Sequence, residues 1–193
     1  MKLRKNLKLL VVAILAIVGT LSCSSELTDN AAPVELVVTH TQNITRIDLD
    51  PVVAAADPDC DDELGTIQMR IFPKNETAEG PFIQVRVTRY RVSYRRTDGG
   101  TLVPPPFVRS IDTLIGVAQT VGSDFRVFEV GAFSQAPFVS LLPQNGGLDP
   151  ETGRPFVKLE VILEVFGETL AGDNVYDSTQ FPMEFCYNCN GCN

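Results

Sequence analysis

Residues 156–166, FVKLEVILEVF, decide the fold of this chain. Apolar side chains occupy every second position from Val157 to Val165, and charged side chains stand between most of them, at Lys158, Glu160 and Glu164. Alternation with a period of two is typical of a β-strand that buries one face. Ile162 and Phe166 fall on the charged face, so we expect that face to be partly covered as well.

Other segments have the same character. Residues 66–72 alternate clearly, and residues 125–130 alternate more weakly. The run at residues 82–96, FIQVRVTRYRVSYRR, changes phase, because its apolar residues lie at odd positions from Ile83 to Val87 and at even positions from Tyr90 on. One inserted residue restores the inward face only as a β-bulge or a sharp bend. The Asp-Gly pair that follows predicts a hairpin that returns through residues 101–103.

The positions of the prolines and of the polar turns also favour an all-β chain. Proline followed by phenylalanine predicts four strand openings, since a strand tolerates proline at its first residue; these are Pro81, Pro106, Pro137 and Pro155. Polar turns fall at residues 143–154 and 168–174, and no segment has the pattern of a three-turn amphipathic helix. We expect one domain at residues 34–193, an antiparallel β-sandwich of the immunoglobulin or fibronectin kind with about seven to nine strands. An antiparallel barrel is the alternative.

The N-terminal sequence predicts an export signal. Basic residues precede an apolar run at residues 9–18, which is shorter than the roughly 20 residues of a transmembrane helix and is typical of a signal peptide. Thr20-Leu21-Ser22-Cys23 resembles the lipobox of bacterial lipoproteins, in which the cysteine is lipidated. The usual lipobox has an aliphatic residue three positions before the cysteine and a small residue two before it, and Thr20 and Leu21 reverse that order. We expect a signal peptide at residues 1–22 and a lipid on Cys23. Ordinary signal-peptide cleavage nearby is the alternative.

The segment after the signal peptide and the net charge indicate what the mature chain can contact. Residues 23–33 are polar without periodicity, which predicts a tether behind the lipidated cysteine. The chain has 24 acidic and 16 basic residues and a net charge of −8, which disfavours nucleic acid and anionic membranes as partners. We therefore expect membrane contact through the lipid, and an envelope protein or polysaccharide as a further partner. By resemblance to enteric lipoproteins, Ser24 favours the outer membrane over the inner.

Four cysteines remain after Cys23: Cys60, Cys186, Cys189 and Cys192. After export they predict two disulfides, one joining Cys60 to the C-terminal tail and the other within the tail, with the pairing open. A zinc site with four thiolates is an alternative, although zinc ribbons use two separate CxxC pairs. A thioredoxin-like role is disfavoured, because its motif opens a helix whereas these cysteines follow a strand.

Two further groups of residues raise the question of chemistry. Asp57, Asp59 and Asp61 have the oxygen ligands that Ca²⁺ prefers, but the segment lacks the glycine and distal glutamate of an EF-hand, so a solvated acidic loop is favoured. His40 is the only histidine, and we expect it at a surface or strand edge and not as a catalytic base.

A basic stripe lies on the phase-shifted segment. Its members are five arginines beside Tyr90 and Tyr94, namely Arg86, Arg89, Arg91, Arg95 and Arg96. Such a stripe could bind an acidic partner or polysaccharide. The solvent face of a strand is the favoured interpretation, since positive charge also discourages pairing of strand edges.

Known hydrolase motifs are absent from the sequence, and one histidine excludes the multi-histidine ligand sets of most zinc hydrolases. The lipobox-like start, the acidic stretch around Cys60 and the FPMEFC segment leading into a CxxC tail resemble uncharacterised bacterial lipoproteins of the myxobacterial type. That group has no assigned activity, so the resemblance implies location and fold class alone. We expect a lipid-anchored accessory or binding module without a cofactor. The alternatives are a Zn²⁺- or Ca²⁺-binding envelope protein and a carbohydrate-active enzyme with two carboxylates.

Overall fold

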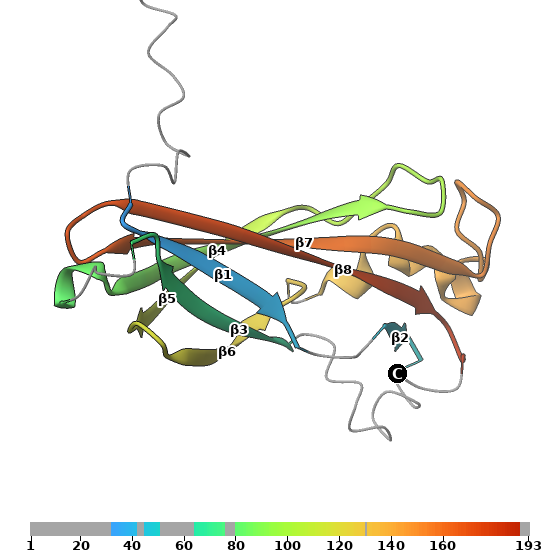
Figure 1. The fold of residues 1–193 in the computed structure, drawn as a ribbon. Coiled ribbons are helices and arrows are strands. Elements are labelled where there is room, and N and C mark those ends of the chain that lie inside the picture. The colour runs from blue at the N-terminus through green and yellow to red at the C-terminus, as the bar shows by residue number, and fades with distance from the viewer. Residues whose placement is uncertain (1–31, 42–44, 51–63, 76–79, 130, 190–193) are drawn as a thin grey trace, which may run out of the picture.

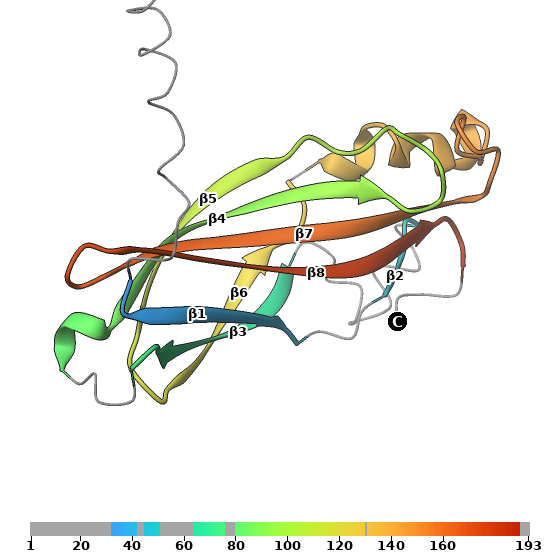
Figure 2. The ribbon, with the colours of Figure 1, turned by 45° about the horizontal axis from the view of Figure 1, so that its top comes forward.

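The chain folds into two β-sheets packed against each other in this computed structural model, which describes residues 32–41, 45–50, 64–75, 80–129 and 131–189 (Figures 1 and 2). The smaller sheet has the order β1-β3-β6, formed by Val34–His40, Leu64–Pro73 and Thr120–Arg126. The larger has the order β2-β8-β7-β4-β5, formed by Arg46–Asp48, Asn174–Cys186, Phe156–Thr169, Val85–Arg96 and Phe107–Ile115. These eight strands in the described residues confirm the β-sandwich.

Strand β7 lies in the middle of the larger sheet, as its alternating sequence suggests. It pairs antiparallel with β4 on one side and β8 on the other. The inward side chains from Val157 to Val165 are fully buried in the core between the sheets. Each such side chain contributes roughly 1.5–3 kcal/mol by leaving water. The outward Ile162 and Phe166 are half-buried, which confirms that neighbours partly cover the second face.

The change of phase in β4 is a β-bulge. The register of β4 against both neighbours shifts between Val87 and Arg89, and Tyr90 and Val92 then point into the core. Gly167 lies opposite Val87, and a Cβ there would stand 2.8 Å from the carbonyl oxygen of Arg86. The bulge therefore brings the β4 backbone so close to β7 that glycine is required opposite it.

One expectation about strand pairing is wrong. The strand that follows the Asp-Gly turn begins at Phe107 and not at residues 101–103. The backbone N–H groups of Thr101 and Leu102 donate to the Glu151 carboxylate, so they are unavailable to a ladder. The long strands of the larger sheet pair antiparallel as expected, and the short strand β2 pairs parallel with the end of β8.

The four proline-phenylalanine pairs divide into two kinds. Pro106 and Pro155 directly precede β5 and β7, as expected. Pro81 instead opens the 3-10 helix η2, Pro81–Ile83, and Pro137 precedes η4, Phe138–Leu141. Strand β6 likewise ends at Arg126, so the expected strand at residues 125–130 is mostly wrong.

Residues 132–145 run through short helical turns because they close one end of the core. They contain η3, η4 and η5, the outer two being Ala132–Ser134 and Pro143–Asn145. The ring centroid of Phe138 lies 5.8 Å from that of Phe128 and 4.5 Å from that of Phe185 on β8. The packing of these rings across the end of the sandwich determines the local conformation, and the weak alternation of the local sequence does not.

Candidate ligand-binding pocket

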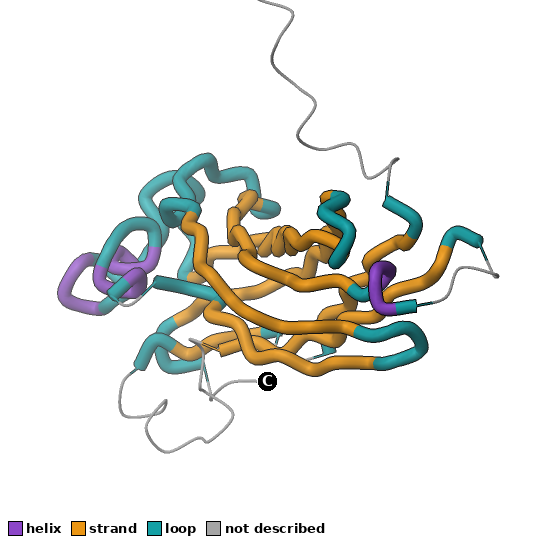
Figure 3. Tube along the Cα trace, turned by 90° about the vertical axis from the view of Figure 1, so that its left-hand side faces the viewer, coloured by secondary structure: helices purple, strands orange, loops and turns teal. Residues whose placement is uncertain are grey.

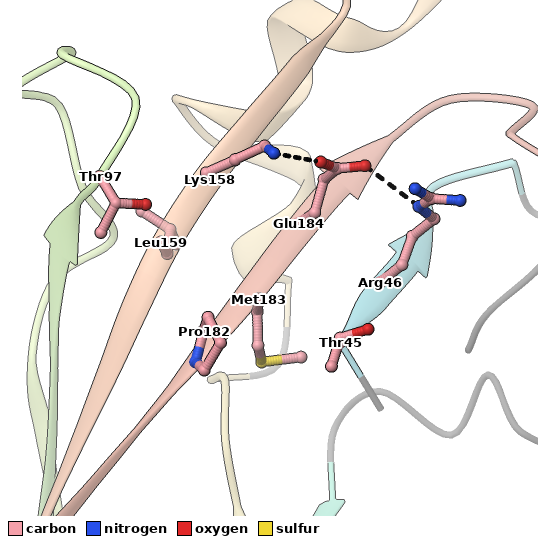
Figure 4. A pocket seen from close by; sticks show the side chains of 8 residues that line it. All are labelled: Thr45, Arg46, Thr97, Lys158, Leu159, Pro182, Met183 and Glu184. Atoms are coloured by element: carbon pink, nitrogen blue, oxygen red, sulfur yellow. Dashed lines mark hydrogen bonds and ion pairs between the residues drawn. The ribbon is translucent and has the colours of Figure 1, made fainter. Parts of the chain in front are cut away.

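A pocket of about 220 Å³ opens on the outer face of the larger sheet, where β2, β8, β7 and the end of β4 lie side by side (Figure 4). Its lining includes Arg46, Thr97, Lys158, Pro182, Met183 and Glu184. Pockets that enclose a whole drug-sized ligand measure about 300–1,000 Å³. This pocket therefore has room for one repeating unit of a larger, polymeric ligand.

Three charged side chains meet across the pocket. The Glu184 carboxylate accepts hydrogen bonds from Lys158 Nζ at 2.9 Å and from Arg46 Nε at 3.0 Å. Sheet register produces this meeting, because Glu184 lies opposite Lys158 on β7 and Arg46 on β2. The hydrogen bond from Lys158 and then the bond from Arg46 hold the pKa of Glu184 below its usual range. The triad keeps one net positive charge, so the pocket favours an anionic group.

The disulfide turn next to the pocket fixes β2 in place. Cys186 and Cys189 form a disulfide just after β8. The buried carboxylate of Asp48 accepts hydrogen bonds from the backbone N–H groups of Asn188 at 2.8 Å and Cys189 at 2.7 Å. Leu49 N–H also donates to the Cys186 carbonyl oxygen at 2.8 Å. The short strand β2, which supplies Arg46, is thus tied to β8 on both sides of Asp48.

A buried ion network supports the β4 side of the pocket. The side chains of Arg96, Asp98 and Asp149 are almost fully buried, and the Arg96 guanidinium donates to both carboxylates at 2.7 Å. Asp98 also accepts from the Lys158 N–H at 2.9 Å, which ties the network to the pocket strand. The network therefore fixes the loop after β4 against the start of β7.

The pKa values in this network indicate a structural role. Burial by itself raises the pKa of Asp98, but hydrogen bonds from Arg96 and from the Lys158 and Gly100 amides outweigh it and lower the pKa to about 2. Burial opposes the same effect at Asp149, where bonds from Arg96 and Thr152 lower the pKa. A glycosidase needs a general acid with a raised pKa. Asp98 and Asp149 have the opposite property.

Four of the five arginines of the basic stripe form ion pairs with carboxylates. Arg86 pairs with Asp112, Arg91 and Arg95 pair with glutamates on β7, and Arg96 turns inward to the buried network. The Arg89 guanidinium lies 4.9 Å from the centre of the Phe166 ring. Tyr90 and Tyr94 point into the core side, where their hydroxyls bond the backbone N–H of Arg126 and the carbonyl oxygen of Val127. The solvent face of a strand is therefore the better interpretation.

His40 ends β1 at a strand edge and is half-buried. Its imidazole stacks on the Phe181 ring with 3.8 Å between centroids and meets the Phe125 ring edge-on. Burial lowers the pKa of His40. These contacts fit the expected edge position and give the ring a packing role.

The remaining candidate residues divide between the described and the undescribed parts of the chain. The Cys186–Cys189 disulfide is one bridge within the tail, and it leaves neither sulfur as a free thiolate. Cys23, Cys60 and Cys192 lie outside the described residues, as do the calcium candidates Asp57, Asp59 and Asp61. Within the described ranges, no group of three or more histidine, cysteine or acidic side chains is placed to hold a metal ion.

Sequence reasoning missed the residues that line the pocket. Lys158 was visible only as the polar position of a strand, and Arg46 and Glu184 stand in no motif. The alternation in residues 156–166 shows that Lys158 faces outward, but its neighbours depend on pairings across the sheet. Strand register is the information that brings them together.

The comparisons with known proteins do not assign this chain to a family. Neither a scan against protein-family models nor a search of curated proteins finds a match for this chain. In the described part of the chain, no helix has the length and apolar character needed to cross a membrane.

Proposed function

We propose that this chain is a lipid-anchored, non-enzymatic module of the bacterial cell envelope that binds an acidic polysaccharide through the pocket on its larger sheet. The export signal and the lipobox-like Thr20–Cys23 segment support the anchor, and Ser24 favours the outer membrane as its destination. The observation that carries the binding part is the Arg46–Glu184–Lys158 triad, which leaves one positive charge at a pocket of an otherwise acidic chain.

A polysaccharide suits this site better than a compact small molecule. The pocket of about 220 Å³ is smaller than a pocket that encloses a whole drug-sized ligand, so it would hold one sugar of a longer chain. The half-buried Phe156 ring lies beside it, with Lys158 Nζ 5.2 Å from the ring centre. A carboxylate on one sugar would bind the cations, and the neighbouring sugar would pack on the apolar ring.

The pairing of three carboxylates with cations supports a non-enzymatic role. Asp98 and Asp149 are held ionised by Arg96, and Glu184 by its two cations. Each carboxylate is thus committed to a cation and unsuited to donate a proton to a glycosidic oxygen.

Affinity electrophoresis tests the binding part. Gels containing polygalacturonate should retard the wild-type protein, and the retardation should weaken with salt because exposed charges are screened. Arg46→Met and Lys158→Met together should abolish the retardation, and gels with neutral dextran should give none. Arg86→Met is the matched control, since Arg86 is an exposed arginine paired with a carboxylate at the other end of the same sheet.

Equal retardation of the wild-type and doubly substituted proteins would contradict the pocket as the binding site. Absence of retardation of the wild type would contradict an acidic polysaccharide as the ligand and turn attention to an envelope protein.

Cell fractionation tests the anchor. Cys23→Ser should release the protein from the membrane fraction, because the lipid has lost its attachment site. Cys192→Ser also removes one thiol but leaves the lipobox-like segment intact, and it should remain with the membrane. A Cys23→Ser protein that stayed in the membrane fraction would contradict the proposed lipid anchor.

A further inference from the structure

Exposed apolar side chains gather at one end of the sandwich. Among the described residues, eight large apolar side chains are exposed. Five of them belong to this end: Phe72, Phe82, Leu114, Val117 and Leu170. Phe82 is the most exposed of them, at 67%. We refer to these five side chains as the apolar end.

Sheet register places the five side chains at the same end of the molecule. Leu114 lies opposite Arg86 at the start of β4, just after η2 and its Phe82. Leu170 N–H, in the β7–β8 turn, donates to the carbonyl oxygen of Gln84 at 2.9 Å. On the smaller sheet, Thr120 pairs with Arg70, which brings the turn that holds Val117 close to Phe72. Figure 3 views the molecule from this end.

The polypeptide also enters the domain at this end. Phe72 lies directly opposite Glu35 near the start of β1, and Lys74 N–H donates to the carbonyl oxygen of Pro33 at 2.9 Å. Cys23 precedes Ala32 by nine residues, which span at most about 30 Å even when fully extended. The disulfide end lies farther off, because the 14 residues of β7 alone extend over about 45 Å.

We infer that the apolar end docks on the surface of a zwitterionic lipid bilayer and places Phe82 and Leu170 among the lipid headgroups and upper acyl chains. The inference rests on the proposed lipid anchor, which holds this end of the domain within about 30 Å of the bilayer. Exposed apolar groups concentrated in one place mark surfaces that contact a partner or a membrane. The bilayer is the apolar partner that the short tether keeps beside them.

The charges around the apolar end select the type of lipid. The carboxylates near it belong to Glu35, Asp112, Glu168 and Asp173, and the cations near it belong to Arg70, Lys74 and Arg86. The mixture gives no basic patch of the kind that binds anionic lipids. Neutral headgroups are therefore the fitting surface. Docking there would direct the pocket, at the opposite end of β7 and β8, away from the bilayer.

A single tryptophan reports docking directly, since the chain contains no natural tryptophan. Phe82→Trp places the probe at the apolar end, and Leu148→Trp is the matched control, because Leu148 is 48% exposed in the loop at the opposite end. Both proteins are expressed from the complete sequence, extracted from membranes and reconstituted into phosphatidylcholine vesicles whose acyl chains carry bromine. The mass of the N-terminal peptide is measured on the same samples. Bromine quenches tryptophan only at close range.

Docking predicts blue-shifted, bromine-quenched emission from Phe82→Trp and unquenched emission from Leu148→Trp. Adding Leu170→Glu to Phe82→Trp should reduce the quenching. A lipidated Phe82→Trp protein without quenching, or equal quenching of both probes, would overturn the docking and leave the anchor standing. Quenching of Phe82→Trp without a lipid on Cys23 would uphold the docking and overturn the anchor. A blue shift that depends on protein concentration without lipid would assign the apolar end to a second copy and overturn the inference.

Discussion

The carboxylate of Asp48 accepts a hydrogen bond of 2.7 Å from the backbone N–H of Cys189, although 141 residues separate the two in sequence. The same carboxylate accepts bonds from Asn188 N–H and Asp50 N–H at 2.8 and 3.0 Å. Strand β2 and the Cys186–Cys189 turn therefore form one unit. That unit sets Arg46 beside Glu184, and so it shapes the pocket.

Loss of the Asp48 carboxylate should destabilise this end of the sandwich. Asp48→Ala leaves three backbone donors without their acceptor, which should lower the free energy of unfolding by about 2–3 kcal/mol. Asp48→Asn should cost less, because its amide oxygen still accepts. Urea unfolding measures both. Asp112→Ala is the control, since it breaks an exposed ion pair worth under about 1 kcal/mol. Equal losses for Asp48→Ala and Asp112→Ala would contradict the role of Asp48.

The Arg96 network predicts a stability that depends on pH. The folded pKa of Asp98 is about 2, below the ordinary 3.8, so its contribution is present above about pH 4 and is lost as pH falls toward 2. At pH 7, Asp98→Asn should lower the free energy of unfolding by about 2 kcal/mol. The wild-type and Asp98→Asn proteins should converge in urea unfolding at pH 2. A difference that stayed constant from pH 7 to pH 2 would rule out ionisation of Asp98 as the cause.

The bulge in β4 requires a glycine on β7. In Gly167→Ala, the new Cβ meets the Arg86 carbonyl oxygen at 2.8 Å and the Val87 Cα at 3.1 Å, so the strands must separate. We expect a loss of about 1–3 kcal/mol in the free energy of unfolding. Gly122→Ala, in β6, is the control, because its nearest contact is the Ile67 carbonyl oxygen at 3.9 Å. If Gly167→Ala were as stable as Gly122→Ala, the close approach at the bulge would be disproved.

His40 should make the sandwich less stable in mild acid. Burial lowers its folded pKa, so the unfolded chain takes up the proton first as pH falls through about 6.5, and stability decreases. His40→Phe keeps the stacking on Phe181 without a titrating group. The difference in Tm between His40→Phe and wild type should therefore shift in favour of His40→Phe from pH 7.5 to pH 5. A difference independent of pH would contradict a depressed pKa at His40.

Local patterns predicted the centre of the fold well. The alternation in residues 156–166 indicates β7 because a half-buried strand imposes a period of two, and the change of phase after Val87 indicates the bulge. The return strand after Asp98 could not be placed in the same way. The carboxylate of Glu151, which is distant in sequence, accepts the backbone N–H groups of Thr101 and Leu102 and so keeps this segment out of the sheet. The helical turns at residues 132–145 were hidden for a similar reason, since aromatic packing against Phe185 shapes them.

The pocket was beyond the reach of sequence patterns. Arg46 and Glu184 are 138 residues apart and meet through a parallel pairing of a strand only three residues long. The basic stripe shows the converse, because charges that looked available in sequence find carboxylate partners across the sheet. In both cases register, which the local sequence does not specify, decides which side chains are neighbours.

The intact mass of protein extracted from the membranes of a producing bacterium, before and after reduction and alkylation, tests the account most directly. The account predicts a chain that begins at Cys23 with a diacylglycerol or triacyl increment, and four further cysteines that react only after reduction. An N-terminus elsewhere with an unmodified Cys23 would contradict the lipid anchor. Four cysteines alkylated without reduction would contradict the disulfides and favour a metal or redox site in the tail.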